Sequence, residues 1–133
     1  MKSKLTFLSI VLAAAIFSLN SCKEDVQKPQ ITLTELGLNN SKIAYIGGDL
    51  HVEADIVAEG NIKTVVIEIH PEGNASWEFD TIYNEFAGLK NATFHKHIDI
   101  PLTAEAGDYH FHFTVTDQNG NQTLVESELE IKE

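Results

Sequence analysis

The chain has 133 residues, with 20 acidic side chains against 9 lysines and no arginine, and a formal charge of −11. A length of this order allows one domain. The chain lacks the clustered positive charge that phosphate recognition needs, so nucleic acid is not expected as a partner. One cysteine cannot form an intramolecular disulfide, so the core must stabilise the fold.

The N-terminus has the pattern of an export signal. A basic start at residues 1–4 precedes an apolar run over 5–17, which is too short to span a bilayer comfortably. Residues 19–22 are similar to a bacterial lipobox, which predicts a lipoprotein signal peptide over 1–21 and lipidation of Cys22. An ordinary secretory signal is the alternative. Residues 22–29 would link the lipid to a domain over 30–133.

The residues directly after the cysteine favour display at the cell surface. Lys23, Glu24 and Asp25 are similar to the export tag of Bacteroidota surface lipoproteins. We therefore expect export across the inner membrane and an outer-membrane lipoprotein that contacts the membrane through its lipid anchor.

Alternation of apolar and polar residues predicts strands over most of the remaining chain. The strands are expected at 30–36, 42–46, 49–58, 62–70, 92–100 and 107–117, followed by a C-terminal strand. Residues 76–83 are expected to form an edge strand or an irregular excursion. About seven or eight antiparallel strands in a chain of this length predict an all-β, immunoglobulin-like sandwich.

The last hairpin can be registered from the sequence. Gly120 supplies the residue with positive φ in a three-residue loop over 118–120. Apolar residues then face apolar residues, and histidines face glutamates, which supports this register because a slip of one residue would reverse every side chain. The predicted pairs are Asp117 with Asn121, Phe113 with Val125, Tyr109 with Leu129, His112 with Glu126, and His110 with Glu128.

Three stretches together resemble one known family. They are DLHVEADI at 49–56, FHKHIDIP at 94–101 and AGDYHFHFTVTD at 106–117. These stretches resemble the domain-of-unknown-function family 4625 of Bacteroidota lipoproteins. The resemblance covers nearly the whole chain after the signal and implies a small exported β-sandwich on a lipid anchor. It implies no activity, so function must be inferred from the residues.

The candidate functional residues are histidines on the outward faces of the predicted strands. Side chains at i and i+2 of a strand project from the same face, so two imidazoles can approach one ion. Nitrogen and carboxylate ligands suit Zn²⁺ or Cu²⁺. The candidate ligands are His51, His70, His95, His97, His110 and His112, with Glu68, Asp99, Glu126 and Glu128 as acidic co-ligands.

In an immunoglobulin-like topology these residues form two patches on opposite sheets. The first patch comprises His70, His110, His112, Glu68, Glu126 and Glu128. The second comprises His51, His95, His97, Glu53, Asp55 and Asp99. If residues 100–107 instead closed a simple hairpin, the histidines at 95, 97, 110 and 112 would share one face, and the sequence leaves both arrangements open.

Two other interpretations compete with metal binding. The histidines can be half-exposed strand residues whose pairing with acids adds only about 0.2–1 kcal/mol per pair. The module can instead recognise a surface protein or glycan without metal, through a region around Trp77 and Phe86 that is expected to be exposed. No arrangement of nucleophile, base and acid argues for catalysis, so we do not expect an enzyme.

Overall fold

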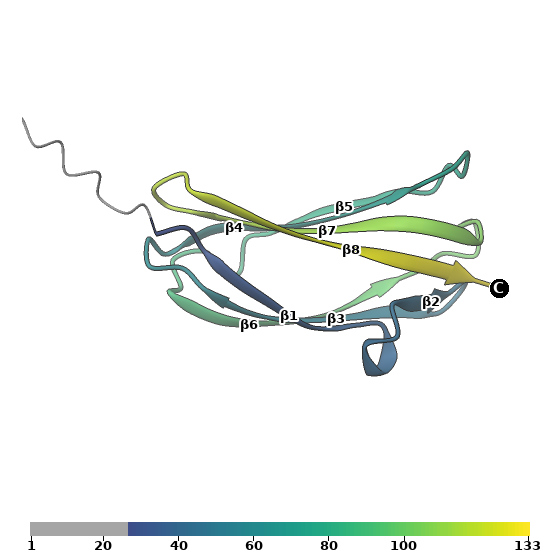
Figure 1. Cartoon of the computed structure of the whole chain (residues 1–133), viewed down its shortest axis with the longest axis horizontal. Coiled ribbons are helices and arrows are strands. Elements are labelled where there is room, and N and C mark those ends of the chain that lie inside the picture. Colours follow the sequence, from purple (N-terminus) through teal and green to yellow (C-terminus); the bar gives the residue numbers. More distant parts are fainter. Residues whose placement is uncertain (1–26) are drawn as a thin grey trace, which may run out of the picture.

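The computed structural model describes residues 27–133, which form an all-β protein of eight strands in two packed sheets (Figure 1). The predicted signal peptide at 1–21 and the predicted lipidation of Cys22 lie outside the described residues. Within 27–133, no helix is long and apolar enough to cross a membrane.

The two sheets have the strand order of an immunoglobulin-like sandwich. The three-stranded sheet has the order β1 (Gln30–Leu36), β3 (Asp49–Val57), β6 (Asn91–Asp99). The five-stranded sheet has the order β2 (Ile43–Tyr45), β8 (Gln122–Lys132), β7 (Gly107–Asp117), β4 (Ile62–Pro71), β5 (Phe79–Tyr83). Strands β6 and β7 lie in different sheets, so the simple hairpin through residues 100–107 is excluded and the two patches lie on opposite sheets.

One strand pair differs from the predicted antiparallel arrangement. Strand β2 runs parallel to β8, whereas every other pair is antiparallel. The chain leaves the three-stranded sheet after β1, passes through the short 3₁₀ turn η1 (Leu38–Asn40), and joins the opposite sheet as β2. A strand of three residues is too short for its pattern of apolar and polar residues to indicate which sheet it joins.

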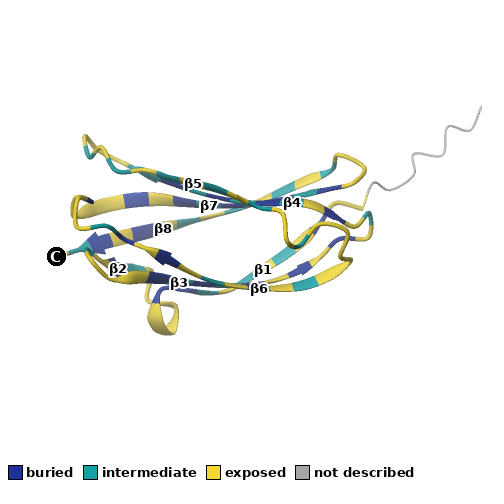
Figure 2. Ribbon diagram, turned by 180° about the vertical axis from the view of Figure 1, so that it is seen from behind, coloured by how far each residue is buried: buried dark blue, intermediate teal, exposed yellow. Residues whose placement is uncertain are grey.

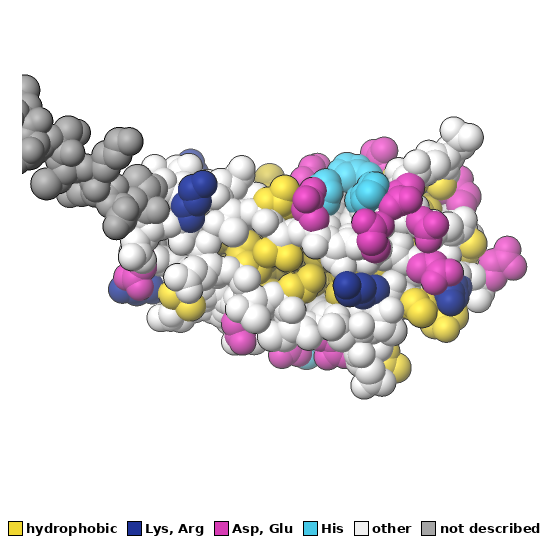
Figure 3. Space-filling model, in the orientation of Figure 1, with side chains coloured by type: hydrophobic (Ala, Val, Ile, Leu, Met, Phe, Trp, Pro, Cys, Tyr) yellow, Lys and Arg dark blue, Asp and Glu magenta, His cyan; other side chains and the backbone are white. Residues whose placement is uncertain are grey.

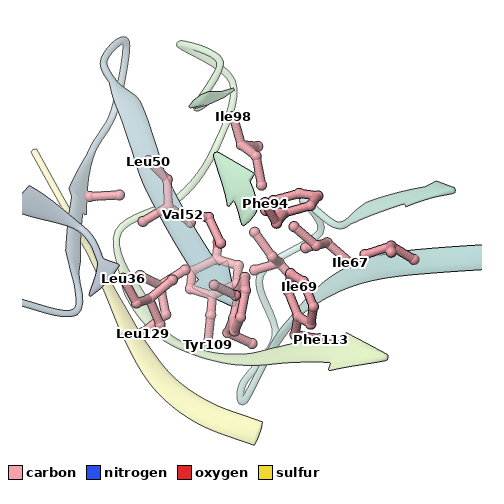
Figure 4. Packing of buried hydrophobic residues seen from close by; sticks show 14 of the residues in the cluster. Leu36, Leu50, Val52, Ile67, Ile69, Phe94, Ile98, Tyr109, Phe113 and Leu129 are labelled. Atoms are coloured by element: carbon pink, nitrogen blue, oxygen red, sulfur yellow. The ribbon is translucent and has the colours of Figure 1, made fainter. Parts of the chain in front are cut away.

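The core forms where the inward residues of the two sheets meet. Buried and exposed residues alternate along β3, β4, β6 and β7, as expected for strands with one face in a core (Figure 2). Phe94 from β6 packs edge-on against Phe113 from β7, with ring centroids 5.0 Å apart, and Leu50 and Val52 enter the same cluster from β3 (Figure 4). The core therefore fixes β3 and β6 side by side, with their polar residues outward.

The predicted register of the last hairpin is confirmed. Phe113 lies opposite Val125 and His112 opposite Glu126, as expected. The buried Tyr109 side chain donates a hydrogen bond to the Glu105 carbonyl at 2.8 Å, which is the tyrosine corner of immunoglobulin-like folds.

The predicted edge strand is also confirmed, as β5 at the margin of the five-stranded sheet.

The irregular segment before β5 is held in place by hydrogen bonds to one carboxylate. Glu105 accepts hydrogen bonds from the Ser76 hydroxyl at 2.8 Å and from the Trp77 backbone N–H at 3.3 Å. These bonds hold the pKa of Glu105 below its ordinary value.

Candidate metal centre

Three histidines meet on the outer face of the three-stranded sheet. In the β3–β6 pair His51 lies opposite His97, and Glu53 lies opposite His95. Each histidine offers a ring nitrogen, and these three atoms lie within 4.8 Å of one another. The second patch predicted from the sequence therefore contains a cluster of three potential nitrogen ligands, which we call the His51 cluster.

The three imidazole rings of the His51 cluster are in mutual contact. The His51 and His97 rings stack with centroids 4.9 Å apart and 6° between their planes. The His95 ring lies 4.7 Å from His51 and 5.5 Å from His97, tilted against both. Three imidazoles in contact would repel one another if all were protonated, whereas three neutral imidazoles can coordinate one metal ion.

Each ring of the His51 cluster directs its Nδ1 towards a different carboxylate. His51 Nδ1 lies 3.5 Å from Glu35 Oε2, and His95 Nδ1 lies 3.6 Å from Glu53 Oε2. His97 Nδ1 is hydrogen-bonded to the Asp49 carboxylate. Metal-binding histidines commonly use one nitrogen for a carboxylate and the other for the ion. If each Nδ1 keeps its carboxylate, Nε2 is the nitrogen that each ring would offer to an ion.

The Nε2 atom of His51 has an unmet hydrogen-bonding need. It is buried and has no hydrogen-bond partner within the described part of the chain, and the nearest carboxylate oxygen recorded for it, Glu53 Oε2, is 3.8 Å away. The His51 side chain as a whole is only 18% exposed. A buried polar atom without a partner is costly, so a coordinating ion would remove a defect of the metal-free protein.

Glu35 was not among the predicted co-ligands, and a β-bulge explains why it reaches the site. The β1–β3 register shifts between Leu33 and Glu35, so Leu33 faces Ala54 while Glu35 faces Glu53. Strict alternation from Leu33 would turn Glu35 inward, and the bulge turns it outward beside His51 instead. Asp49 was also missed, although it stands on the outward parity of β3 two residues before His51.

A second cluster lies on the outer face of the five-stranded sheet. Glu68 and His70 from β4 and His112 from β7 offer one ligand atom each within 4.8 Å of one another. The His70 and His112 rings lie 5.8 Å apart at 65°, and His112 Nε2 is 3.3 Å from Glu126 Oε1. Figure 3 shows histidines in a group ringed by acidic side chains on the side of the five-stranded sheet.

His110 does not join this second cluster, although the sequence placed it in the same patch. Its Nε2 lies 3.4 Å from Glu72 Oε1 and its Nδ1 lies 3.7 Å from Glu128 Oε1. These three residues form a separate, exposed group of one imidazole and two carboxylates. The pKa of Glu72 is raised, chiefly by a hydrogen bond with Glu128. The first patch therefore divides into a His70–His112 part and a His110 part flanked by two acids.

The remaining predicted residues fall outside these groups or at their margins. Asp99 belongs to no cluster of three ligands among residues 27–133, and Asp55 accepts a hydrogen bond from Thr93 Oγ1 at 3.0 Å. Trp77 and Phe86, expected as an exposed contact region, are half-buried and pack against the core. That surface is consequently smaller than the sequence suggested.

Comparison with known sequences identifies one family. The profile described as "Domain of unknown function (DUF4625)" matches residues 17–132 of the chain. This confirms the family expected from residues 49–56, 94–101 and 106–117. No curated protein matches the chain.

Comparison with solved structures yields distant neighbours. A family 123 glycoside hydrolase from Clostridium perfringens is 13% identical with a TM-score of 0.44, and the alignment covers 79% of this chain and 27% of the hydrolase. The superoxide reductase neelaredoxin from Ignicoccus hospitalis is 12% identical with a TM-score of 0.45, covering 79% of this chain and 80% of the reductase. The chain thus spans about a quarter of the hydrolase.

Proposed function

Because the chain belongs to the DUF4625 family, whose function is unknown, we propose its role from the chemistry of the site. The protein is a binding module that holds a divalent transition metal at His51, His95 and His97. The observation that carries this proposal is the convergence of three imidazole nitrogens within 4.8 Å of one another, from rings that each have their own carboxylate partner. Histidines that serve only as polar surface residues are not required to bring their ring nitrogens together in this way.

The ligand set favours Zn²⁺ or Cu²⁺. Imidazole nitrogen suits both ions, and sulfur ligands that would favour Cu⁺ are lacking in the cluster. Three protein ligands leave a fourth position open on a tetrahedral ion. We propose binding or delivery of the ion rather than catalysis, because the cluster contains no positioned nucleophile or acid beyond the carboxylates that orient its rings.

The proposed location is the outer membrane, with Cys22 lipidated and the domain facing outward. The first described residues lie at one end of the sandwich, and η1 and β2 lie at the other (Figure 1). An anchor before residue 27 would therefore hold the η1 end, which lies near the His51 cluster, away from the lipid. An acidic surface also raises the local concentration of cations.

Calorimetric titration of the untagged full chain in detergent tests the metal proposal. We expect one Zn²⁺ or Cu²⁺ ion to bind with a Kd below about 10 µM. The double variant His51→Ala with His97→Ala should lose this event. The matched control is His110→Ala, which removes an outward histidine from the other sheet and should leave the event intact. Equal binding by the double variant would disprove the assignment.

A further inference from the structure

A groove of about 530 Å³ lies directly beside the His51 cluster. His51, His97 and Asp49 line one part of it, and Leu38, Ile43 and Tyr45 line the other. Two of the three proposed metal ligands thus form part of its wall. An ion held by the cluster would stand at the edge of a partly apolar depression.

The apolar part of the groove is held out in solvent rather than folded into the core. Leu38 is 73% exposed and Tyr45 is 55% exposed. The backbone around Leu38 is unusual, with φ of 74° at Gly37, 55° at Asn39 and 58° at Lys42. Left-handed backbone at non-glycine residues costs energy and persists only where the surroundings enforce it. The surrounding contacts therefore hold the backbone of residues 37–42 in a conformation that exposes the Leu38 side chain to solvent.

The same segment is tied to the proposed metal ligand His51 by two connections. The backbone N–H of Gly37 donates to the His51 carbonyl at 2.8 Å. The Glu35 carboxylate accepts from the backbone N–H of Asn39 at 2.7 Å through Oε1, while its Oε2 faces His51 Nδ1. The groove wall and the metal-facing ring are consequently positioned by one carboxylate.

The charges around the groove determine which ligand it can accept. No lysine is among the described residues that line it, and Asp49 is its single charged residue apart from the histidines. An organic anion finds no cationic partner there in the metal-free protein. A divalent ion on three neutral imidazoles supplies two positive charges and an open coordination position, which an anionic oxygen donor can fill.

We propose that the groove binds the apolar body of a monocarboxylate whose carboxylate completes the coordination of the metal in the His51 cluster. This inference rests on the proposed metal-binding function and names the class of ligand that the same site takes. The hydrocarbon part lies over Leu38 and Tyr45, and its burial adds to the affinity that the metal–oxygen contact provides. The two contributions act together only when the ion is present.

The test is titration of the full chain in detergent with 3-phenylpropionate, in a buffer without coordinating anions, with and without one equivalent of Zn²⁺. Two-dimensional NMR of the labelled protein follows the residues that respond. Acetate has the same carboxylate without the apolar body, 3-phenylpropan-1-ol has the same body without the carboxylate, and 3-phenylpropylamine reverses the charge. We expect 3-phenylpropionate to bind only with Zn²⁺, at least about tenfold more tightly than acetate.

Leu38→Ser removes the apolar wall at an exposed position, so the fold should be unaffected. It should lower the affinity for 3-phenylpropionate to that for acetate, about tenfold, and leave Zn²⁺ affinity unchanged. Leu124→Ser is the matched control, since Leu124 is 47% exposed, does not line the groove and should have no effect.

Each result separates the inference from the function on which it rests. If Zn²⁺ binds but 3-phenylpropionate binds no better than acetate, the inference is wrong and the metal proposal stands. Binding of the amine to the metal-free protein, without binding of the carboxylate to the Zn²⁺ form, also overturns the inference. If Zn²⁺ itself does not bind, both proposals are wrong.

Discussion

The Glu35 side chain lies diagonally across the β1–β3 pair from His51, with its Oε2 3.5 Å from His51 Nδ1, because a bulge turns the side chain outward. The other oxygen of the same carboxylate accepts a hydrogen bond from the Asn39 backbone N–H at 2.7 Å. The two oxygens of the Glu35 carboxylate thus make separate contacts. One contacts the segment that carries Leu38, and the other contacts the His51 ring proposed to bind metal. A carboxylate held in this way orients an imidazole and strengthens it as a ligand.

We predict that Glu35→Gln weakens Zn²⁺ binding by about 10–100-fold, because losing such an orienting partner has an effect of this size in metal sites. Calorimetric titration measures the change. Glu126→Gln is the control, since Glu126 contacts His112 on the opposite sheet. It should leave the first binding event unchanged. Equal loss in both variants would indicate a general charge effect of the acidic surface instead of a specific contact.

The division of the first histidine patch yields a second prediction. Glu68, His70 and His112 supply two nitrogens and one oxygen, whereas His110 supplies a single nitrogen between the carboxylates of Glu72 and Glu128. We expect a second, weaker ion after the first, removed by His112→Ala and retained by His110→Ala. Titration of the double variant His51→Ala with His97→Ala isolates this event. Loss of the event in both single variants would show that the two histidines act as one pair.

The sequence predicted the faces of the histidines well because strand parity is a local property. In every strand that carries a histidine, alternate residues are apolar and must face the core. The residues between them, which include the histidines, must therefore face outward. His51, His95 and His97 therefore stand where alternation placed them. Their convergence depended only on which strands are neighbours, and the immunoglobulin-like topology supplied β3 beside β6.

The acidic partners were harder to predict, because the alternation of residues along a strand does not by itself identify them. Glu35 needs the bulge in β1. Glu72 lies beyond the strand expected over 62–70, yet β4 continues through Pro71 and the Glu72 N–H donates to the Asp108 carbonyl at 2.9 Å. Asp49, rather than Asp99 opposite it, bonds His97, and alternation cannot distinguish two acids that face each other.

The tyrosine corner gives a prediction about stability. Tyr109→Phe removes the hydrogen bond from the buried hydroxyl to the Glu105 carbonyl and keeps the ring in the core. We expect the free energy of unfolding to fall by about 1 kcal/mol, the usual net contribution of one hydrogen bond. Urea unfolding followed by Trp77 fluorescence measures it. Tyr45→Phe, at a residue that is 55% exposed, should change the value by much less.

Asp117 provides a prediction about pH, because its buried carboxylate organises the last hairpin. Its Oδ1 accepts hydrogen bonds from the backbone N–H groups of Asn119 at 2.9 Å and Asn121 at 2.8 Å, and its Oδ2 accepts one from the Asn121 amide at 3.0 Å. Burial acts to raise the pKa of Asp117, but these hydrogen bonds outweigh burial, so the pKa lies below its ordinary value of 3.8. The ionised form is therefore the one that the fold stabilises.

A pKa that is lower in the folded chain than in the unfolded chain stabilises the fold at pH values above the unfolded value. This stability is present in full above about pH 5 and is lost as the pH falls through 3.8 towards the lower pKa of the folded state.

The variant Asp117→Asn cannot ionise at this position, and it places an amide donor against the Asn121 amide. We expect the variant to be less stable than the unmodified protein at pH 7, with the difference shrinking below pH 4. Urea unfolding at several pH values measures this difference, and the exposed Asp80→Asn serves as the control. A difference that stays constant with pH would mean that Asp117 acts through shape alone.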